Sequence, residues 1–369
     1  MKYQQCNRCL MDTTAEDIIF DEHGNCNFCE DFIKKLKNPI KKVNLNLEEF
    51  VQKIKEDGKG KNYDCIVGVS GGVDSSYTLV KVKELGLRPL AVHMDNGWNS
   101  ELAVSNIKNL IEKLDVELYT HVIDWSEYRQ LMQSFFDADV IDVELLYDNA
   151  MLAVNYKLAN RYGVKYILSG SNIATEGMKI PNNWNWFKFD KKNIKELSKK
   201  GNVKLKTFPS FGTLDFVYHE FLRKIKWIGF LDYLPDYNKF EVLEVLEKEF
   251  HYKPYPYKHY ESVFTRFYQG YILPKKFNVD KRKIHLSTLI ISEQITRNEA
   301  FKQLEGIPYP SESAQNEDIE FFLKKMLWKK KDLEIYLTRE EKLHSVYGSE
   351  KKLWDMLLNI YKKYRIKKD

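Results

Sequence analysis

Long apolar runs are missing from this chain of 369 residues. No stretch approaches the roughly 20 apolar residues that span a bilayer, and the N-terminus lacks the apolar core of a signal peptide. Charge of one sign is also scarce, because 58 Lys and Arg stand against 53 Asp and Glu. The resulting net charge of +5 does not by itself call for nucleic acid. These absences predict a cytoplasmic protein that binds neither a membrane nor a nucleic acid.

Cysteine is rare as well, and four of the five cysteines fall near the N-terminus. Cys6 and Cys9 form one CxxC pair, and Cys26 and Cys29 form a second. Two such pairs supply the four thiolates that a tetrahedral Zn²⁺ takes. Because a full set of thiolates leaves no open position for substrate, we expect the zinc to be structural. Two disulfides are the alternative, which a reducing cytoplasm disfavours.

The segment 64–76, DCIVGVSGGVDSS, combines a buried strand, a glycine turn and the start of a helix. Adjacent glycines let the backbone approach an oxyanion, toward which helical N–H groups would point. The hydroxyls of Ser70, Ser75 and Ser76 would point the same way. Asp74, in the first turn of the helix, can hold a metal ion against phosphate oxygens. A tight turn with a Ser/Asp cap is the alternative.

The spacing of this loop excludes two commoner phosphate-binding loops. No lysine follows the glycines, as GxxxxGKS/T requires, and the pattern is not GxGxxG. It resembles instead the SGGxDS loop, or PP-loop, of the N-type ATP pyrophosphatases. That family cleaves ATP between its α and β phosphates, transfers AMP to an oxygen of the substrate and releases pyrophosphate. The resemblance implies ATP and Mg²⁺ as cofactors. It also implies contacts to them from Ser70, Gly71, Gly72, Asp74, Ser75 and Ser76.

Strand and helix patterns alternate from residue 63 onward. We expect strands at 65–69, 90–94, 116–123 and 165–169 and helices at 73–85, 101–114, 126–136 and 147–162. Further helices are expected at 213–226, 238–250 and 260–272. The alternation predicts an α/β fold, a parallel sheet flanked by helices of the Rossmann-like PP-loop kind. The predicted domains are a zinc-binding knuckle (1–40), a linker with a short helix (41–62), the PP-loop domain (63–280) with an aromatic insertion near 181–235, and a helical C-terminal region (281–369).

Ligands on parallel sheets bind at the carboxyl ends of the strands. The loop 92–98, VHMDNGW, follows the second expected strand. In PP-loop proteins this loop contacts the nucleoside, so His93, Asp95 and Asn96 are candidates for cofactor binding. A plain strand-end turn explains each of them equally well.

The loop 169–177, SGSNIATEG, follows the fourth expected strand. Its small residues allow close backbone approach, so Ser169, Gly170 and Asn172 are candidates for lining the phosphate–substrate cleft. Glu176 is either a carboxylate ligand for Mg²⁺ or part of a helix cap.

Two later segments also carry candidates. The segment 181–189, PNNWNWFKF, places aromatics among asparagines, which fits stacking on a sugar or base, or plain packing of an insertion. The segment 257–277 carries several cations, among them Lys258, His259 and Lys275. Such cations would clamp pyrophosphate as charge builds on the leaving group. A surface helix with ion pairs is the alternative.

Five motifs together look like the N-acetyl sugar amidotransferase family. They are the double knuckle CNRCLMD and CNFC, then VSGGVDSS, HMDNGW, SGSNIATEG and KHYESVFTRFYQGYILPKKF. The resemblance covers residues 1 to about 300. It implies an enzyme that converts the acetamido group of a nucleotide-linked N-acetylated sugar to an acetamidino group. Such enzymes act in bacterial surface-polysaccharide or flagellin-glycan synthesis. Asp74, Glu176 and Lys258 are the predicted catalytic residues.

The reaction implied by the resemblance needs ammonia. The chain starts Met1–Lys2 without a nucleophilic cysteine, and Cys65 falls inside an expected buried strand. A built-in glutaminase is therefore not expected. The resemblance implies a separate glutaminase subunit, with a cyclase-like partner, that supplies the ammonia.

Two other functions compete with this interpretation. A tRNA sulfurtransferase also joins zinc knuckles to a PP-loop, but such enzymes usually need cysteines in the catalytic domain for a persulfide or an iron–sulfur cluster. Only Cys65 is available for that here. A non-catalytic zinc adaptor is the other possibility, against which the complete PP-loop signature argues.

Overall fold

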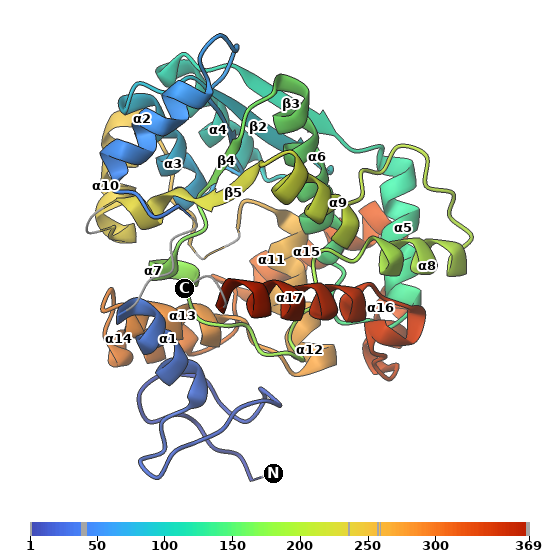
Figure 1. Cartoon of the computed structure of the whole chain (residues 1–369). Coiled ribbons are helices and arrows are strands. Elements are labelled where there is room, and N and C mark those ends of the chain that lie inside the picture. The colour runs from blue at the N-terminus through green and yellow to red at the C-terminus, as the bar shows by residue number, and fades with distance from the viewer. Residues whose placement is uncertain (1, 38–42, 235–236, 257, 259, 367–369) are drawn as a thin grey trace.

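The computed structural model describes residues 2–37, 43–234, 237–256, 258 and 260–366. Within these residues, five parallel strands form one sheet in the order β3-β2-β1-β4-β5 (Figure 1). The strands are β1 (Cys65–Gly68), β2 (Pro89–Asp95), β3 (Leu118–Val122), β4 (Tyr166–Ser169) and β5 (Lys226–Gly229). The predicted parallel sheet flanked by helices is confirmed.

Helices precede, connect and follow the strands. Those up to residue 250 are α1 (Asn27–Lys37), α2 (Leu47–Asp57), α3 (Val73–Glu84), α4 (Glu101–Leu114), α5 (Trp125–Asp137), α6 (Leu145–Tyr162), α7 (Ile173–Glu176), α8 (Lys191–Lys200), α9 (Thr213–Val217) and α10 (Lys239–Phe250). Those after it are α11 (Val263–Phe267), α12 (Leu273–Phe277), α13 (Arg282–Ile291), α14 (Arg297–Leu304), α15 (Glu312–Met326), α16 (Lys330–Thr338) and α17 (Lys351–Ile366).

Helices cover both faces of the sheet, because the central strand β1 carries apolar side chains on both of its faces. Cys65 and Val67 of β1 pack into one core with α2, α3, α4 and α10. Ile66, between them, points to the opposite face and joins a second core with α5 and α6. Successive side chains of a strand point to opposite faces, so a continuous apolar run is what a doubly covered parallel strand requires.

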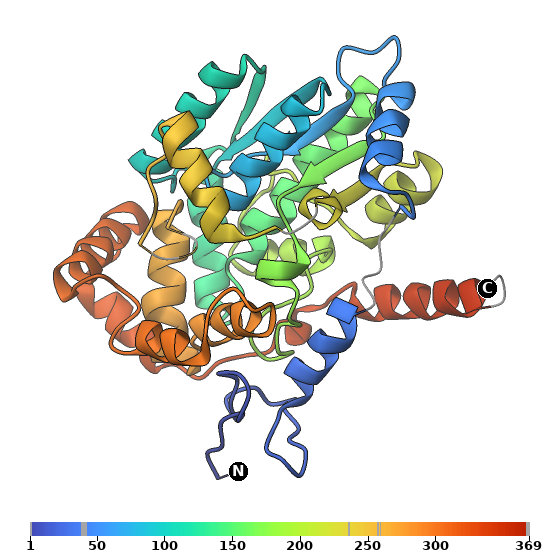
Figure 2. The same ribbon diagram turned by 90° about the vertical axis from the view of Figure 1, so that its left-hand side faces the viewer.

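The helices after residue 260 lie together below the sheet in the view of Figure 1, and the N-terminal knuckle lies beneath them. The knuckle is held to α13 and α14. The Leu10 N–H donates to the Ser287 hydroxyl at 2.9 Å, and the Arg297 guanidinium donates to the Cys6 carbonyl at 3.0 Å. Figure 2 shows α17 extending outward toward the C-terminus. Within the described residues, every helix is too short or too polar to traverse a bilayer.

One expected helix is too long at its C-terminal end. The helix predicted over 213–226 is observed as α9 followed by a π-helical turn over Tyr218–Leu222, and it ends there because β5 begins at Lys226. β5 pairs in parallel with β4, with Tyr166 opposite Lys226. Residues 181–235, predicted to be an insertion, therefore contribute the edge strand of the sheet.

The aromatic residues of 181–189 pack within the protein. Trp184 is buried, and its indole N–H donates to the Thr14 carbonyl of the knuckle at 3.2 Å. Trp186 stacks on His344 with ring centres 5.0 Å apart. Of the two functions considered for this segment, packing is the one that these tryptophans serve.

Candidate active site at the β1–β4 edge of the sheet

The strand order changes direction at β1, with β2 and β3 on one side of it and β4 and β5 on the other. In open α/β sheets such a switch point opens a crevice at the carboxyl ends of the strands. A cavity of about 810 Å³ lies there, lined by Ser70 after β1 and by Gly170 after β4. Residues from two of the loops singled out in the sequence therefore line one cavity.

The loop from β1 to α3 is braced by its own hydrogen bonds. The Ser75 hydroxyl donates to the Gly72 carbonyl at 3.1 Å, and the Gly72 N–H donates to the Ser70 hydroxyl at 3.3 Å. Gly71 adopts φ +86°, a conformation that glycine takes without strain. Its carbonyl accepts a hydrogen bond from Tyr252 at 2.9 Å. The fixed loop places the first turn of α3 beside the cavity, where its free N–H groups attract an anion.

Gly170 lies directly against this turn. A Cβ on Gly170 would lie 2.6 Å from the carbonyl carbon of Asp74 and from the nitrogen of Ser75. Only a residue without a side chain allows the end of β4 to approach α3 this closely. The small residues after β4 therefore set the width of the phosphate-binding edge.

The Asp74 carboxylate lines the cavity and is positioned by two hydroxyl donors. Tyr237 donates to one of its oxygens, and Thr175 donates to the other at 3.1 Å. Burial raises the pKa of the Tyr237 hydroxyl, and the neighbouring Asp74 charge raises that pKa further, so the phenol stays protonated as a donor. Mg²⁺ is commonly bound by one or two carboxylates together with the phosphates of a substrate, so a carboxylate fixed at this position suits a magnesium site.

Two lysines approach Asp74 from outside the loop. Lys258 forms an ion pair with Glu176 at 2.8 Å. Burial alone would lower the pKa of Lys258, but Glu176 and Asp74 outweigh it, so its pKa is raised and the amine stays charged. For Lys239, at the start of α10, burial dominates and lowers the pKa. Both amines line the cavity, where they can oppose phosphate charge.

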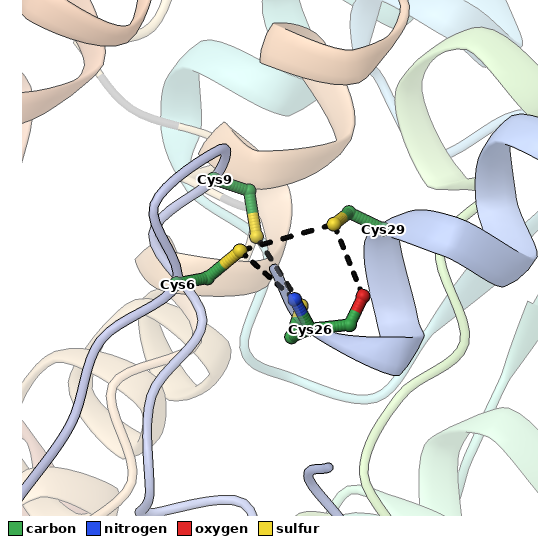
Figure 3. Close-up of side chains that lie close together, drawn as sticks. All are labelled: Cys6, Cys9, Cys26 and Cys29. Carbon is green, nitrogen blue, oxygen red and sulfur yellow. Dashed lines mark hydrogen bonds between the residues drawn. The ribbon is translucent and has the colours of Figure 1, made fainter. Parts of the chain in front are cut away.

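The four N-terminal cysteines converge as predicted (Figure 3). The Cys9 and Cys26 sulfurs are 3.6 Å apart, and the Cys6 and Cys29 sulfurs are 3.8 Å apart. A zinc tetrahedron with Zn–S bonds of about 2.3 Å has sulfur–sulfur edges of about 3.8 Å, so the donor set fits a structural zinc ion. All four side chains are buried, and the Cys26 N–H donates to the Cys6 sulfur at 3.2 Å, which supports thiolate charge.

Many of the residues predicted to bind ATP or to take part in catalysis line the cavity. Those that do are Ser70, Gly72, Asp74, Ser75, Gly170, Glu176 and Lys258, together with Ser169. Gly71 shapes the turn without lining the cavity. Ser76 is buried inside α3, and its hydroxyl has no hydrogen-bond partner among the described residues. Asn172 caps α7 by accepting from the Thr175 N–H at 2.8 Å, and His259 lies outside the described residues.

The remaining candidates lie apart from this cavity. The His93 ring contacts the Val69 carbonyl at 2.9 Å, which ties β2 to the end of β1. Asp95 accepts from the Gly97 N–H at 2.8 Å and stabilises the turn after β2. Asn96 lines a neighbouring cavity. Lys275 is exposed on α12, which corrects its assignment to the phosphate clamp. The lysine that α12 turns toward the protein is Lys276, and it pairs with Asp139 at 3.2 Å.

Sequence reasoning missed Tyr237, Lys239 and Thr175. Each contacts Asp74 or lies near it only because α7 and α10 fold back against α3. Lys239 stood at the start of a correctly expected helix, but no motif distinguishes it from the other lysines of the chain. A contact between residues so far apart in sequence leaves no local signal.

Two family models match the chain. Residues 40–181 match the model of NAD synthase, and residues 261–361 match the model described as "LPS biosynthesis protein WbpG-like, C-terminal domain". No curated protein matches the chain.

Solved structures show low similarity. NMN synthetase from Francisella tularensis is 17% identical, with a TM-score of 0.29 over 59% of this chain and 100% of that chain. NH3-dependent NAD synthetase from Campylobacter jejuni is 16% identical, with a TM-score of 0.28 over 60% of this chain and 93% of that chain. The U34-tRNA thiolase NcsA from Methanococcus maripaludis is 15% identical, with a TM-score of 0.33 over 80% of this chain and 90% of that chain. Scores this low support no statement about substrate.

The parallel sheet, the complete PP-loop and the match to the NAD synthase model support an ATP-using enzyme of the PP-loop type. Its NAD synthase-like segment is joined to a WbpG-like C-terminal domain, named for lipopolysaccharide biosynthesis. Together the two matches fit an amidotransferase of the PP-loop ATP pyrophosphatase superfamily, as the sequence motifs predicted.

Proposed function

We propose that the chain is an ATP-dependent amidotransferase that forms an acetamidino group on an N-acetylated, nucleotide-linked sugar. It would act in the synthesis of a bacterial surface polysaccharide or glycan, and release AMP and pyrophosphate. The observation that carries this proposal is the complete PP-loop, including Asp74, which shares a cavity with Lys258 in a chain whose C-terminal domain is WbpG-like.

The chemistry requires activation of a poor electrophile. The acetamido oxygen attacks the α-phosphorus of ATP, a P–O bond forms, and the bond to the β-phosphate breaks as pyrophosphate leaves. Ammonia then adds to the resulting O-adenylyl imidate. The C–O bond to AMP breaks, and a proton is lost to leave the amidine. The protein must hold the reacting atoms in line and stabilise charge on the leaving group, and no nucleophilic side chain is needed.

The residues of the cavity divide this work between them. The N–H groups at the start of α3 and the hydroxyls of Ser70 and Ser75 would hold the triphosphate. Lys258 and Lys239 would oppose the charge that builds on pyrophosphate. Asp74, with Glu176 across the cavity, would hold Mg²⁺, which supplies charge neutralisation to the phosphates. The thiolates of the N-terminal knuckle would hold Zn²⁺, which stabilises the fold of that segment.

Ammonia would come from a separate glutaminase subunit with a cyclase-like partner. Support for an external source comes from the cysteines, since four form the knuckle cluster and Cys65 is fully buried in β1. Burial also raises the pKa of the Cys65 thiol, with a smaller contribution from Asp64, which makes it a poor nucleophile. The same facts weigh against tRNA thiolation, which would need a reactive thiol near the bound nucleotide.

Incubation with ATP, Mg²⁺, ammonium and a panel of nucleotide-linked mono- and diacetamido hexoses tests the proposal. We expect AMP, pyrophosphate and a sugar whose mass fits replacement of O by NH. Thiolation of tRNA, or release of ADP and orthophosphate, would refute it. Full activity with glutamine in place of ammonium, without another protein, would refute the need for a glutaminase partner.

A further inference from the structure

The cavity of about 810 Å³ that Ser70 and Gly170 line is called the PP-loop cavity below. A second cavity, of about 400 Å³, lies beside it. Ser70 of the loop lines both cavities, and so do Glu176 and Glu261. The Glu261 carboxylate is close to the loop, because a Cβ placed on Gly72 would lie 3.2 Å from one of its oxygens. A molecule in the second cavity would therefore lie next to phosphates that the loop holds.

The wall of this second cavity is shared between the two matched segments. Asn96 and Asp148 come from the NAD synthase-like segment, whereas Thr265 and Gln269 come from the WbpG-like domain. Asn185, between the two segments, lines the second cavity without lining the first. The WbpG-like domain thus places residues beside the PP-loop, where they can select the molecule that reacts with ATP.

The polar groups of the second cavity are fixed in place by one another. Gln269 donates from its amide nitrogen to both oxygens of Glu144 at 3.0 Å, which leaves its amide oxygen as an acceptor. Lys281 pairs with Glu144 at 2.8 Å, and Lys188 pairs with Asp148 at 2.9 Å. Lys188 also pairs with Asp142 at 2.7 Å. Each ammonium has three N–H donors, so each still has at least one donor for a ligand. Preorganised donors and acceptors in a cavity of this size suit a small molecule with several hydroxyl groups.

We propose that the second cavity binds the pyranose ring of the N-acetylated sugar, with its reacting acetamido group directed toward Ser70 and the α-phosphate. The inference rests on the proposed function and adds to it the place where the acceptor lies. The PP-loop cavity then holds ATP, and the acetamido oxygen meets the α-phosphorus where the two cavities join.

The charge of the lining fits the product of this reaction. The carboxylates are Glu144, Asp148, Glu176 and Glu261, against the lysines Lys188 and Lys281. The acetamido group is neutral, but positive charge develops as ammonia adds, and the amidine takes up a proton to become a cation. Although Glu176, Glu144 and Asp148 each pair with a lysine, carboxylates close to the reacting carbon stabilise that charge in the transition state more than in the neutral substrate.

Two variants of the second cavity test the assignment, each with an intact PP-loop. Thr288→Val removes a hydroxyl with little change in side-chain volume, and Asn185→Ala removes an amide; both residues line the second cavity and not the first. Gln130→Leu, exposed on α5 and remote from both cavities, is the matched control. Calorimetry measures binding of ATP and, separately, of the nucleotide-linked acetamido hexose that the wild-type protein converts. Loss of one or two hydrogen bonds should raise the sugar dissociation constant about three- to tenfold. Binding of ATP should not change.

The outcomes separate the inference from the function on which it rests. Weaker sugar binding with unchanged ATP binding in both cavity variants, and wild-type behaviour of the control, supports the assignment. If the wild-type protein amidinates a sugar that both cavity variants bind normally, the sugar lies elsewhere while the proposed function stands. Equal loss of sugar and ATP affinity would show a structural effect and overturn the assignment. If the wild-type protein converts no sugar of the panel, both proposals fail.

Discussion

Replacing Gly170 with alanine would place a methyl group against the first turn of α3, where the triphosphate is expected to bind. The new carbon would lie 2.6 Å from the carbonyl carbon of Asp74 and the nitrogen of Ser75. Non-bonded carbon atoms rest at about 3.5–4.0 Å, so the overlap is about 1 Å. Because both contacted atoms belong to the main chain, no side chain can rotate away to relieve it. The end of β4 and the start of α3 must separate.

The expected cost follows from that separation. Overpacking of this kind destabilises a protein by about 1–3 kcal/mol. A displacement approaching 1 Å in a phosphate-holding turn can lower turnover about a hundredfold, because reacting groups lose their alignment. AMP formation should therefore fall far more than the modest change in stability alone would explain.

Gly68→Ala provides a matched control on the neighbouring strand. A Cβ there would lie 3.8 Å from its nearest neighbour, the Asn155 amide oxygen, which is ordinary contact. Thermal unfolding and the rate of AMP release, measured for both variants, test the reasoning. Because Gly68 also lines the cavity, Gly68→Ala controls for thermal unfolding, in which it should remain close to wild type. Wild-type turnover in Gly170→Ala would refute the close approach on which the geometry of the site depends.

Three further perturbations follow from the structure. Asp74→Asn keeps the shape of the side chain but removes its charge, so AMP formation should fall about a hundredfold or more with little change in thermal unfolding; retained AMP release would exclude a metal-holding role. Cys9→Ser should lower both bound zinc and melting temperature, whereas Cys65→Ala should keep the zinc; metal content by elemental analysis would expose an error if both variants kept it. Burial lowers the pKa of His344 to about 3, with Asp142 opposing and Lys188 adding to this shift. The unfolded chain therefore binds one more proton than the folded chain below pH about 6.5, and stability should fall by about 1.4 kcal/mol per pH unit as pH drops from there toward 3. His344→Gln should flatten that dependence in denaturant titrations, and an unchanged slope would contradict the buried neutral ring.

The central strands and the loop between them were predictable because their signals are local. The apolar run before Ser70 needs both faces covered, and the glycines need a turn, so strand, loop and helix follow from adjacent residues. The four cysteines were equally predictable from spacing, since two CxxC pairs require a shared partner. Gly170 and Glu176 were found because they lie in the segment that directly follows a recognisable strand.

The parts that failed depend on contacts between distant segments. β5 is four residues long and follows a π-helical turn, and its pairing with β4 decides its conformation. The sequence does not distinguish Lys275 from Lys276. Only the packing of α12 directs Lys275 to the solvent and Lys276 to Asp139. Tyr237, just before α10, bonds to Asp74, and Lys239 lies in the same cavity, because α10 packs on α3; local sequence patterns do not predict that packing.

Transfer of an isotopic label tests the central claim most directly. A nucleotide-linked acetamido sugar carrying heavy oxygen in its acetamido group is incubated with the protein, ATP, Mg²⁺ and ammonium, and the products are examined by mass spectrometry. Attack of the amide oxygen on the α-phosphorus predicts that the label leaves the sugar and appears in the phosphate of AMP. Label found in orthophosphate, or unlabelled AMP beside an amidinated sugar, would contradict the account.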